Sequence, residues 1–293
     1  MRGGGGTMAD RPAERRAAGD PPLVRLALVG AACCFLGVVL VLPLATVFVE
    51  AFAKGAGAFR DAILEPDTLA AIRLTLGVTA VTVAANLVFG VAAAWAITRF
   101  RFRGRRLLST LIELPLAVSP VVSGLVFVLL LGESGIVGPW FAARGIKLIF
   151  AVPGIVVATL FVTLPYVARE LIPLMESVGA GEEEAALTLG ARGWQILRHV
   201  TLPNIRWGLL YGIVLTSARA LGEFGAVSVV SGHIRGETST VPLQVEILYN
   251  EYNFAAAFAV ASLLTLLAVV TIVAKQWLGR RTRRAAGLTG GGA

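Results

Sequence analysis

Six long apolar runs most constrain what this chain can fold into. They cover residues 26–49, 74–97, 107–131, 148–168, 207–230 and 254–274. A helix of about 20 apolar residues is long enough to cross the ~30 Å hydrocarbon core of a bilayer. Hydrophobic residues make up 56% of the 293 residues and charged residues only 15%, against about 25% charged residues in ordinary soluble domains. The sequence therefore predicts an all-α membrane protein with six transmembrane helices.

The chain divides into four predicted parts. Residues 1–22 are rich in Gly and Arg and are expected to form a disordered cytoplasmic head. Residues 23–68 hold the first span and an outer loop, residues 69–278 form the core, and residues 279–293 form a basic tail. A cleaved signal peptide is the alternative for the first run, which is followed by Ala-Phe-Ala at residues 51–53. The apolar part of a signal peptide has roughly 7–15 residues, so the longer run here favours a retained span.

The distribution of arginines predicts the orientation of the spans. The segment "RFRFRGRR", which ends at Arg106, and the tail after the last span carry basic residues with no acids among them. The other loops mix acids with bases. By the positive-inside rule, both termini and the arginine-rich loop face the cytoplasm. A cysteine at Gly104 is then expected to be accessible from inside, and one at Thr238 from outside. The net charge of +8 is explained by topology and does not indicate nucleic-acid binding.

A charged insert interrupts the apolar pattern before the fifth run. It reads "GEEEAALTLGARGWQILRHVTLPNIRWG" over residues 181–208. Three glutamates, residues 182–184, fit the first turn of a short helix because their charges suit its partly positive end. Gly190 can adopt the left-handed conformation that ends such a helix, and Pro203 suits the first turn of the next span. We expect two short helices on the cytoplasmic side. The alternative is an amphipathic loop lying on the lipid surface.

Apolar residues at helical spacing give this insert a face that needs a partner. On the two expected helices they are Ala185, Ala186, Leu189, Trp194, Leu197 and Val200.

The stretch "EAALTLGARGWQILRHVTLP" resembles the EAA signature of the permeases of bacterial ABC importers. The matching residues are Glu184, Ala185, Ala186, Gly190, Leu202 and Pro203, while Val200 replaces the commoner Ile. The resemblance implies a type-1 (MetI-like) ABC permease fold with a cytoplasmic coupling helix that docks on an ATPase subunit. It assigns ATPase coupling to these residues together with Trp194.

A second resemblance concerns the transported ion. "LIELPLAVSPVVSGLVFVLLLG", "RALGEFGA" and the segment that begins "VSVVSGHIRGET" are similar to W-type permeases of sulfate/thiosulfate importers, over roughly residues 69–277. Glu113 stands where that family is expected to have Asp. The resemblance implies a permease subunit for sulfate or thiosulfate in the bacterial inner membrane. Another tetrahedral oxyanion such as molybdate is the alternative.

The same resemblance implies the partners of this subunit. They are a T-type permease, two copies of an ATPase, and a periplasmic or lipid-tethered binding protein. The subunit itself is expected to be no enzyme and to bind no cofactor or metal, with ATP used by the partner ATPase. In agreement, the sequence has no G-x-x-x-x-G-K-[S/T] loop for ATP phosphates, and its only histidines are His199 and His233.

Charges within the spans are candidates for the transport pathway. Arg219 and Glu223 are four residues apart and are expected to share one helix face, either as a structural ion pair or with Arg219 facing the anion. Glu113 has the same two interpretations, and Pro115 and Pro120 are expected to break the span near it. These charges are too few for an ion-coupled secondary transporter, and a scaffold role would not explain the EAA spacing.

Two cations in the segment after the fifth span, His233 and Arg235, are candidate contacts for a binding protein. The alternative is that they only balance nearby acids in a solvated turn.

Overall fold

The structure is a computed structural model that describes residues 22–289 as helices joined by short connections, with no strand in that range. Side chains are described for residues 23–277. The described chain forms two units that divide after Thr46. The predicted head lies outside the described residues except for its last residue. The predicted tail begins within α14 (Phe254–Thr289), which continues to Thr289.

The first unit holds most of the predicted first span and ends within α2 (Leu42–Ala51). Helix α1 (Pro22–Leu36) continues through a π-helical turn, η1 (Gly37–Val41), into α2. The π-helical turn ends two residues before Pro43, whose missing N–H removes one hydrogen bond of the regular helix. The whole segment Leu23–Ala51 is long and apolar enough to cross a membrane.

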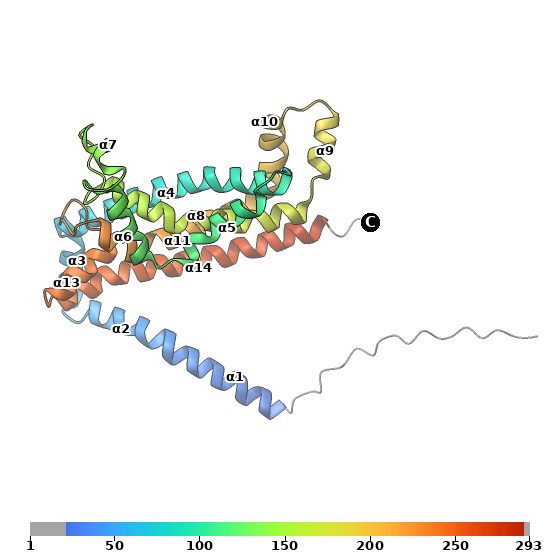
Figure 1. Cartoon of the computed structure of the whole chain (residues 1–293). Helices are drawn as coiled ribbons and strands as arrows, with labels where there is room; N and C mark the ends of the chain where they lie inside the picture. The colour runs from blue at the N-terminus through green and yellow to red at the C-terminus, as the bar shows by residue number, and fades with distance from the viewer. Residues whose placement is uncertain (1–21, 290–293) are drawn as a thin grey trace, which may run out of the picture. The chain divides into compact units, whose positions relative to one another are not determined.

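The second unit is a bundle of long helices. Helix α4 (Pro66–Arg99) packs along α8 (Val152–Val178) and α11 (Leu202–Leu221), and α11 packs on α14 (Figure 1). A Cβ at Gly90 on α4 would lie 2.5 Å from Val167 Cγ1 on α8. Glycine therefore permits the close approach of these two helices, as small residues do in membrane bundles.

The third predicted span is bent rather than straight. Helix α5 (Arg105–Ala117) and helix α6 (Pro120–Leu131) meet at an angle of 107°. Between them Ser119 has an extended backbone, with ψ 131°, because proline disfavours the helical conformation in the residue before it. The predicted break is thus found at Pro120, whereas Pro115 lies inside α5 without ending it.

The fifth predicted span is also broken. Helix α11 ends at Leu221, and a six-residue helix, α12 (Gly225–Val230), follows after a short break. Glu223 lies in that break, so the expectation that Arg219 and Glu223 share the face of one continuous helix is wrong. Both residues still meet, as described below.

The sequence predicts six spans, but fewer of the described helices are long and apolar enough to cross a membrane. Four described helices are long and apolar enough to cross a membrane, or five if α5 and α6 form one bent span. Helix α11 is not among them. Asn204, Arg206 and Arg219 make it more polar than the others.

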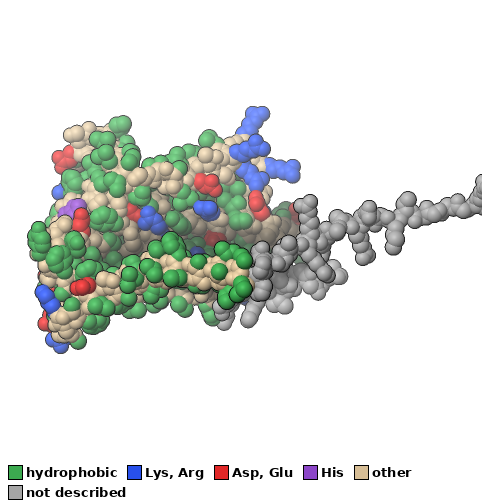
Figure 2. Space-filling model, turned by 90° about the horizontal axis from the view of Figure 1, so that it is seen from below, with side chains coloured by type: hydrophobic (Ala, Val, Ile, Leu, Met, Phe, Trp, Pro, Cys, Tyr) green, Lys and Arg blue, Asp and Glu red, His purple; other side chains and the backbone are tan. Residues whose placement is uncertain are grey.

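Short helices cover the two ends of the bundle. At one end lie α3 (Gly55–Leu64), α7 (Gly138–Ala142) and α13 (Val241–Asn250), and at the other end α9 (Gly181–Thr188) and α10 (Gly193–Ile196) project sideways (Figure 1). Lys and Arg side chains gather toward the end with α9 and α10 in the space-filling view (Figure 2).

Two residues expected in accessible loops are unsuitable for labelling. Thr238 is only 3% exposed, and its hydroxyl accepts a hydrogen bond from the Ile234 N–H. It is buried because α13 and the segment before it fold back onto the bundle. Gly104 has a φ of +99°, a conformation that a cysteine would adopt only with strain.

Candidate functional site

The EAA loop (residues 179–203) connects α8 to α11 and carries the matched signature. Gly179, with a φ of +76°, ends α8, and α9 begins two residues later. All three glutamates of the insert lie in the first turn of α9, as predicted from the dipole of the helix.

Gly190 ends α9 in the predicted left-handed conformation, with a φ of +86°. Its N–H donates to the carbonyl of Leu187, and the N–H of Ala191 donates to the carbonyl of Ala186, both at 3.0 Å. This pair of bonds is the Schellman motif, which satisfies the last free carbonyls of a helix. The glycine therefore sets the direction in which the chain leaves α9.

The second half of the EAA loop returns the chain to the bundle. The Gln195 side chain accepts a hydrogen bond of 2.8 Å from the Arg192 N–H at the start of α10. Helix α10 continues through a π-helical turn, η2 (Leu197–Thr201), into α11. Pro203 lies in the first turn of α11, as predicted. The helix is continuous with η2 there, so Pro203, like Pro43, follows a π-helical turn and removes one hydrogen bond of the regular helix.

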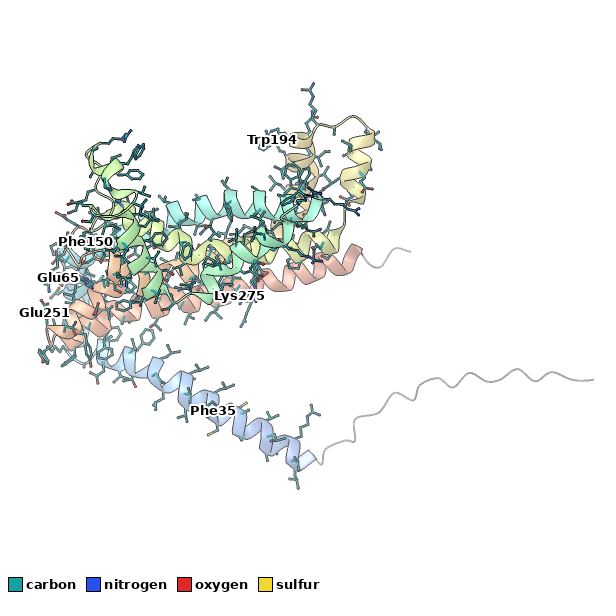
Figure 3. The ribbon with its side chains drawn as sticks, viewed as in Figure 1. Phe35, Glu65, Phe150, Trp194, Glu251 and Lys275 are labelled. Carbon is teal, nitrogen blue, oxygen red and sulfur yellow. The ribbon has the colours of Figure 1, made fainter. Side chains whose placement is uncertain are left out.

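The outer surface of the EAA loop exposes apolar side chains. Trp194 is 68% exposed on the projecting α10 (Figure 3). Leu189 is 88% exposed and Leu187 is 62% exposed at the end of α9. Leu187 was absent from the predicted apolar face, whereas Leu197 and Val200 prove to be half-buried. The apolar surface thus lies around the turn between the two short helices.

A cluster of polar side chains anchors the base of the EAA loop. In this Arg99 cluster the Arg99 Nε donates to Glu183 Oε2 at 2.6 Å. Glu183 Oε1 accepts from the hydroxyl of Thr201 at 2.8 Å, and Glu182 accepts from the Asn204 side chain at 2.5 Å. Glu182 and Glu184 are both exposed, but Glu184 makes no side-chain hydrogen bond with the described residues. The neighbouring glutamates therefore have different environments: two hold the loop and one faces outward.

Arg219 and Glu223 form an ion pair across the break between α11 and α12. The Glu223 side chain is 1% exposed and the Arg219 side chain 29%. The other carboxylate oxygen of Glu223 accepts a hydrogen bond of 2.9 Å from the Ala226 N–H in the first turn of α12. The pair therefore stabilises the break, while part of the Arg219 side chain remains exposed.

Glu113 has a different environment from Glu223. It lies exposed on α5 and forms no ion pair with any described residue. Its carboxylate therefore lies on the surface of this chain.

The two candidate residues at the other end of the bundle each lie beside a carboxylate. His233 Nε2 lies 3.4 Å from a Glu246 carboxylate oxygen, and Arg235 forms an ion pair with Glu251. Glu251 lies at the end of the bundle opposite to Trp194 (Figure 3). All four of these side chains are 39–49% exposed.

Residues 86–284 match the family described as "Binding-protein-dependent transport system inner membrane component". The chain belongs to this family. It is 51% identical over 251 residues to the sulfate transport system permease protein CysW of Escherichia coli, covering 86% of each chain. Identity to CysW of Synechocystis is 52% over 259 residues, covering 88% of this chain and 94% of that protein. The sulfate transport system permease protein CysT of Escherichia coli is 37% identical over 80% of this chain and 85% of that protein.

The fold of this transport component is also found in a solved structure. A bacterial alginate ABC transporter, crystallised with an alginate-bound periplasmic protein, aligns with a TM-score of 0.72 at 18% identity. The alignment covers 90% of this chain and 95% of that one. The type-1 ABC permease fold implied by the sequence is therefore confirmed.

The family match covers the EAA loop, the Arg219–Glu223 pair and the segment with His233. Arg99 was interpreted from the sequence only as a charge that sets topology. The sequence held one signal for the contact of Arg99 with α9. Two acids, Glu182 and Glu183, stand just before the EAA signature and need a basic or polar partner. No group of three His, Cys, Asp or Glu residues that would suit a metal ion occurs among the described residues.

Proposed function

We propose that this chain is a permease subunit of an ATP-driven importer, and that the imported ion is sulfate or thiosulfate. The observation that carries the proposal is 51% identity, over 86% of the chain, to a protein named sulfate transport system permease. The family description supports the more general part of the proposal, namely that the chain is a membrane component of a transport system that depends on a binding protein.

The EAA loop is proposed to dock on a cytoplasmic ATPase subunit, one of two copies in the complex. Leu187, Leu189 and Trp194 supply exposed apolar area around one turn, which is typical of a surface that a protein partner covers. Glu184 adds an outward-facing carboxylate, and Gly190 holds the turn. Ala185 and Ala186 belong to α9, and Leu202 and Pro203 begin α11, where the loop returns to the bundle. ATP is bound by the partner, and this chain needs no cofactor of its own.

A second permease is proposed as the membrane partner, of the T type. The 37% identity to CysT supports this, because this chain and CysT then represent two related halves of one assembly. Both termini and the EAA loop are proposed to face the cytoplasm. The opposite end, with α13, then meets a periplasmic or lipid-tethered binding protein.

Arg219 is proposed to contribute to the pathway of the anion. Glu223 is buried and braces the break, whereas Arg219 is 29% exposed. An arginine that is paired and still partly exposed can attract a dianion without leaving an unpaired charge in the membrane. Glu113, exposed on α5, is proposed to face the partner permease or the pathway. At the outer end, His233 and Arg235 are proposed to contact the binding protein while their acidic partners limit the local positive charge.

The test is sulfate uptake into proteoliposomes that contain this chain, a T-type permease, the ATPase and the binding protein. We expect uptake that requires ATP, proceeds without any ion gradient, and is inhibited by thiosulfate. Uptake driven by a proton or sodium gradient without ATP would contradict the proposal. If the complex transports molybdate and does not transport sulfate, the proposed importer function stands but the proposed ion is wrong.

A further inference from the structure

We propose that Arg99 is a positioning residue that joins α9 to the ends of α4 and α8, so that the three move together when the ATPase acts on the EAA loop. The inference rests on the proposed coupling function. It assigns to one side chain the transmission of movement from the loop to the spans.

The guanidinium of Arg99 contacts two other elements at once. Arg99 is the last residue of α4. Its Nε donates to Glu183 on α9 at 2.6 Å, and its Nη1 and Nη2 donate to the backbone carbonyls of Met175 and Gly179 at 3.1 and 2.7 Å. These two carbonyls belong to the last turn of α8 and to its C-cap. All three nitrogens of the fork are therefore used, and they connect α4, α8 and α9.

The acids of α9 extend this connection to the other end of the loop. Glu183 also accepts from Thr201, which is 1% exposed at the end of η2, and Glu182 accepts from Asn204 in the first turn of α11. The beginning and the end of the EAA loop are thus both hydrogen-bonded to the carboxylates of Glu182 and Glu183. A displacement of α9 is resisted at its entry and at its exit.

The covalent connection alone would not transmit such a displacement. Between α8 and α9 the chain passes through Gly179 and Ala180, and Gly179 has a φ of +76°. Glycine allows a wide range of backbone conformations, so a turn of this kind absorbs movement between the helices it joins. The Arg99–Glu183 contact bridges the turn through side chains and makes it stiff.

Burial distinguishes this contact from the other ion pair nearby. The Arg99 and Glu183 side chains are 11% and 13% exposed. Arg105 and Glu176, which also link the start of α5 to the end of α8, are 41% and 53% exposed and make one contact of 3.3 Å. A planar fork that engages several acceptors holds a fixed geometry, whereas exposed single pairs contribute little. Arg105 therefore provides a matched control.

The first experiment measures sulfate transported per ATP hydrolysed in the reconstituted complex. Arg99→Gln, Arg99→Lys and Glu183→Gln are compared with Arg105→Gln. Loss of one element of a coupling network changes coupling by about two- to thirtyfold. We expect a decrease in that range for the first three variants, with ATP hydrolysis retained, and no change for Arg105→Gln. Lysine does not substitute because it lacks the planar fork.

The second experiment measures movement directly and does not depend on transport. Spin labels at Ser177, on the last turn of α8, and Thr188, on α9, report the distance between the two helices; both residues are exposed. In the parent complex we expect a narrow distance distribution that is the same with and without a trapped ATP analogue. In Arg99→Gln and Glu183→Gln the distribution should broaden or shift when the analogue binds.

An unchanged distance distribution in both variants would contradict the proposal, as would normal transport per ATP. If Arg99→Gln or Glu183→Gln fails to assemble into the complex, the other of these two variants, or Arg99→Lys, provides the test. Absence of sulfate transport in the parent complex would instead contradict the proposed function, while the spin-label distances would still report on the Arg99 cluster.

Discussion

The two ends of the bundle use the same ion-pair chemistry in different environments. At the base of the EAA loop, Arg99 and Glu183 are 11% and 13% exposed, and both make further hydrogen bonds within the Arg99 cluster. At the opposite end, Arg235 and Glu251 are 43% and 49% exposed. Solvent screens the second pair, so it is worth little, whereas breaking the first would leave a charge with poor access to water. The first pair is held in a fixed geometry by its burial and its further hydrogen bonds, whereas the second pair can rearrange more freely.

The first test asks whether the two ends lie on opposite sides of the membrane. We expect each cysteine either to react with the reagent or not to react at all. A cysteine replacing Glu237, which is exposed near the outer pairs, should react with an impermeant thiol reagent added to intact cells. A cysteine replacing Arg103, exposed near the EAA loop, should react only after the cells are opened. The background is a variant in which Cys33 and Cys34, the free cysteines, are replaced by Ser. Reversed labelling would contradict the proposed orientation.

Charge reversal should separate the two ends by stability. Glu183→Lys places a second cation beside Arg99, and we expect a loss of about 3 kcal/mol, within the range for breaking a buried pair. Glu251→Lys removes an exposed pair, and we expect a loss of about 1 kcal/mol or less. Thermal unfolding of the purified protein in detergent measures both. Equal losses would show that burial does not distinguish the two ends.

Rigidity of the EAA loop is also expected to depend on Gly190. In Gly190→Val a β-branched residue must adopt a positive φ, which costs about 1–2 kcal/mol. The turn with Leu187 and Leu189 should move, and ATP-dependent uptake should fall while ATPase activity persists. Gly181→Ala is the control, because a Cβ at Gly181 would meet no heavy atom within 4 Å and the φ there is not positive. Normal uptake by Gly190→Val would argue against a fixed docking turn.

A roughly tenfold effect on transport is expected at Arg219, in the last turn of α11. Arg219→Gln should lower sulfate uptake about tenfold, the change that corresponds to about 1.4 kcal/mol in a barrier. The Arg219→Gln/Glu223→Gln double variant should remain slow, because the pathway cation is absent in both. Full recovery of uptake in the double variant would show that Arg219 acts only as the partner of Glu223.

Features that depend on neighbouring residues could be predicted from the sequence. The apolar runs predicted the long helices, because a helix satisfies its own backbone hydrogen bonds and needs only apolar side chains to suit lipid. The spacing from Glu184 to Pro203 predicted both short helices of the EAA loop and the left-handed Gly190, since a Schellman motif is formed within six residues. Pro120 predicted a break in the third span through its effect on the preceding residue.

Which charges meet was settled by the packing of the helices. Arg99 and Glu183 are 84 residues apart in the sequence, and their contact depends on how α4 packs along α8. The same packing buries Thr238 and leaves Glu184 exposed beside two anchored glutamates. Burial and ion pairing depend on distances between helices, which local patterns do not specify. Residue patterns alone predicted the helices and the turn at Gly190. Which charged residues hold the EAA loop in place was determined by tertiary contacts, because those residues are far apart in the sequence.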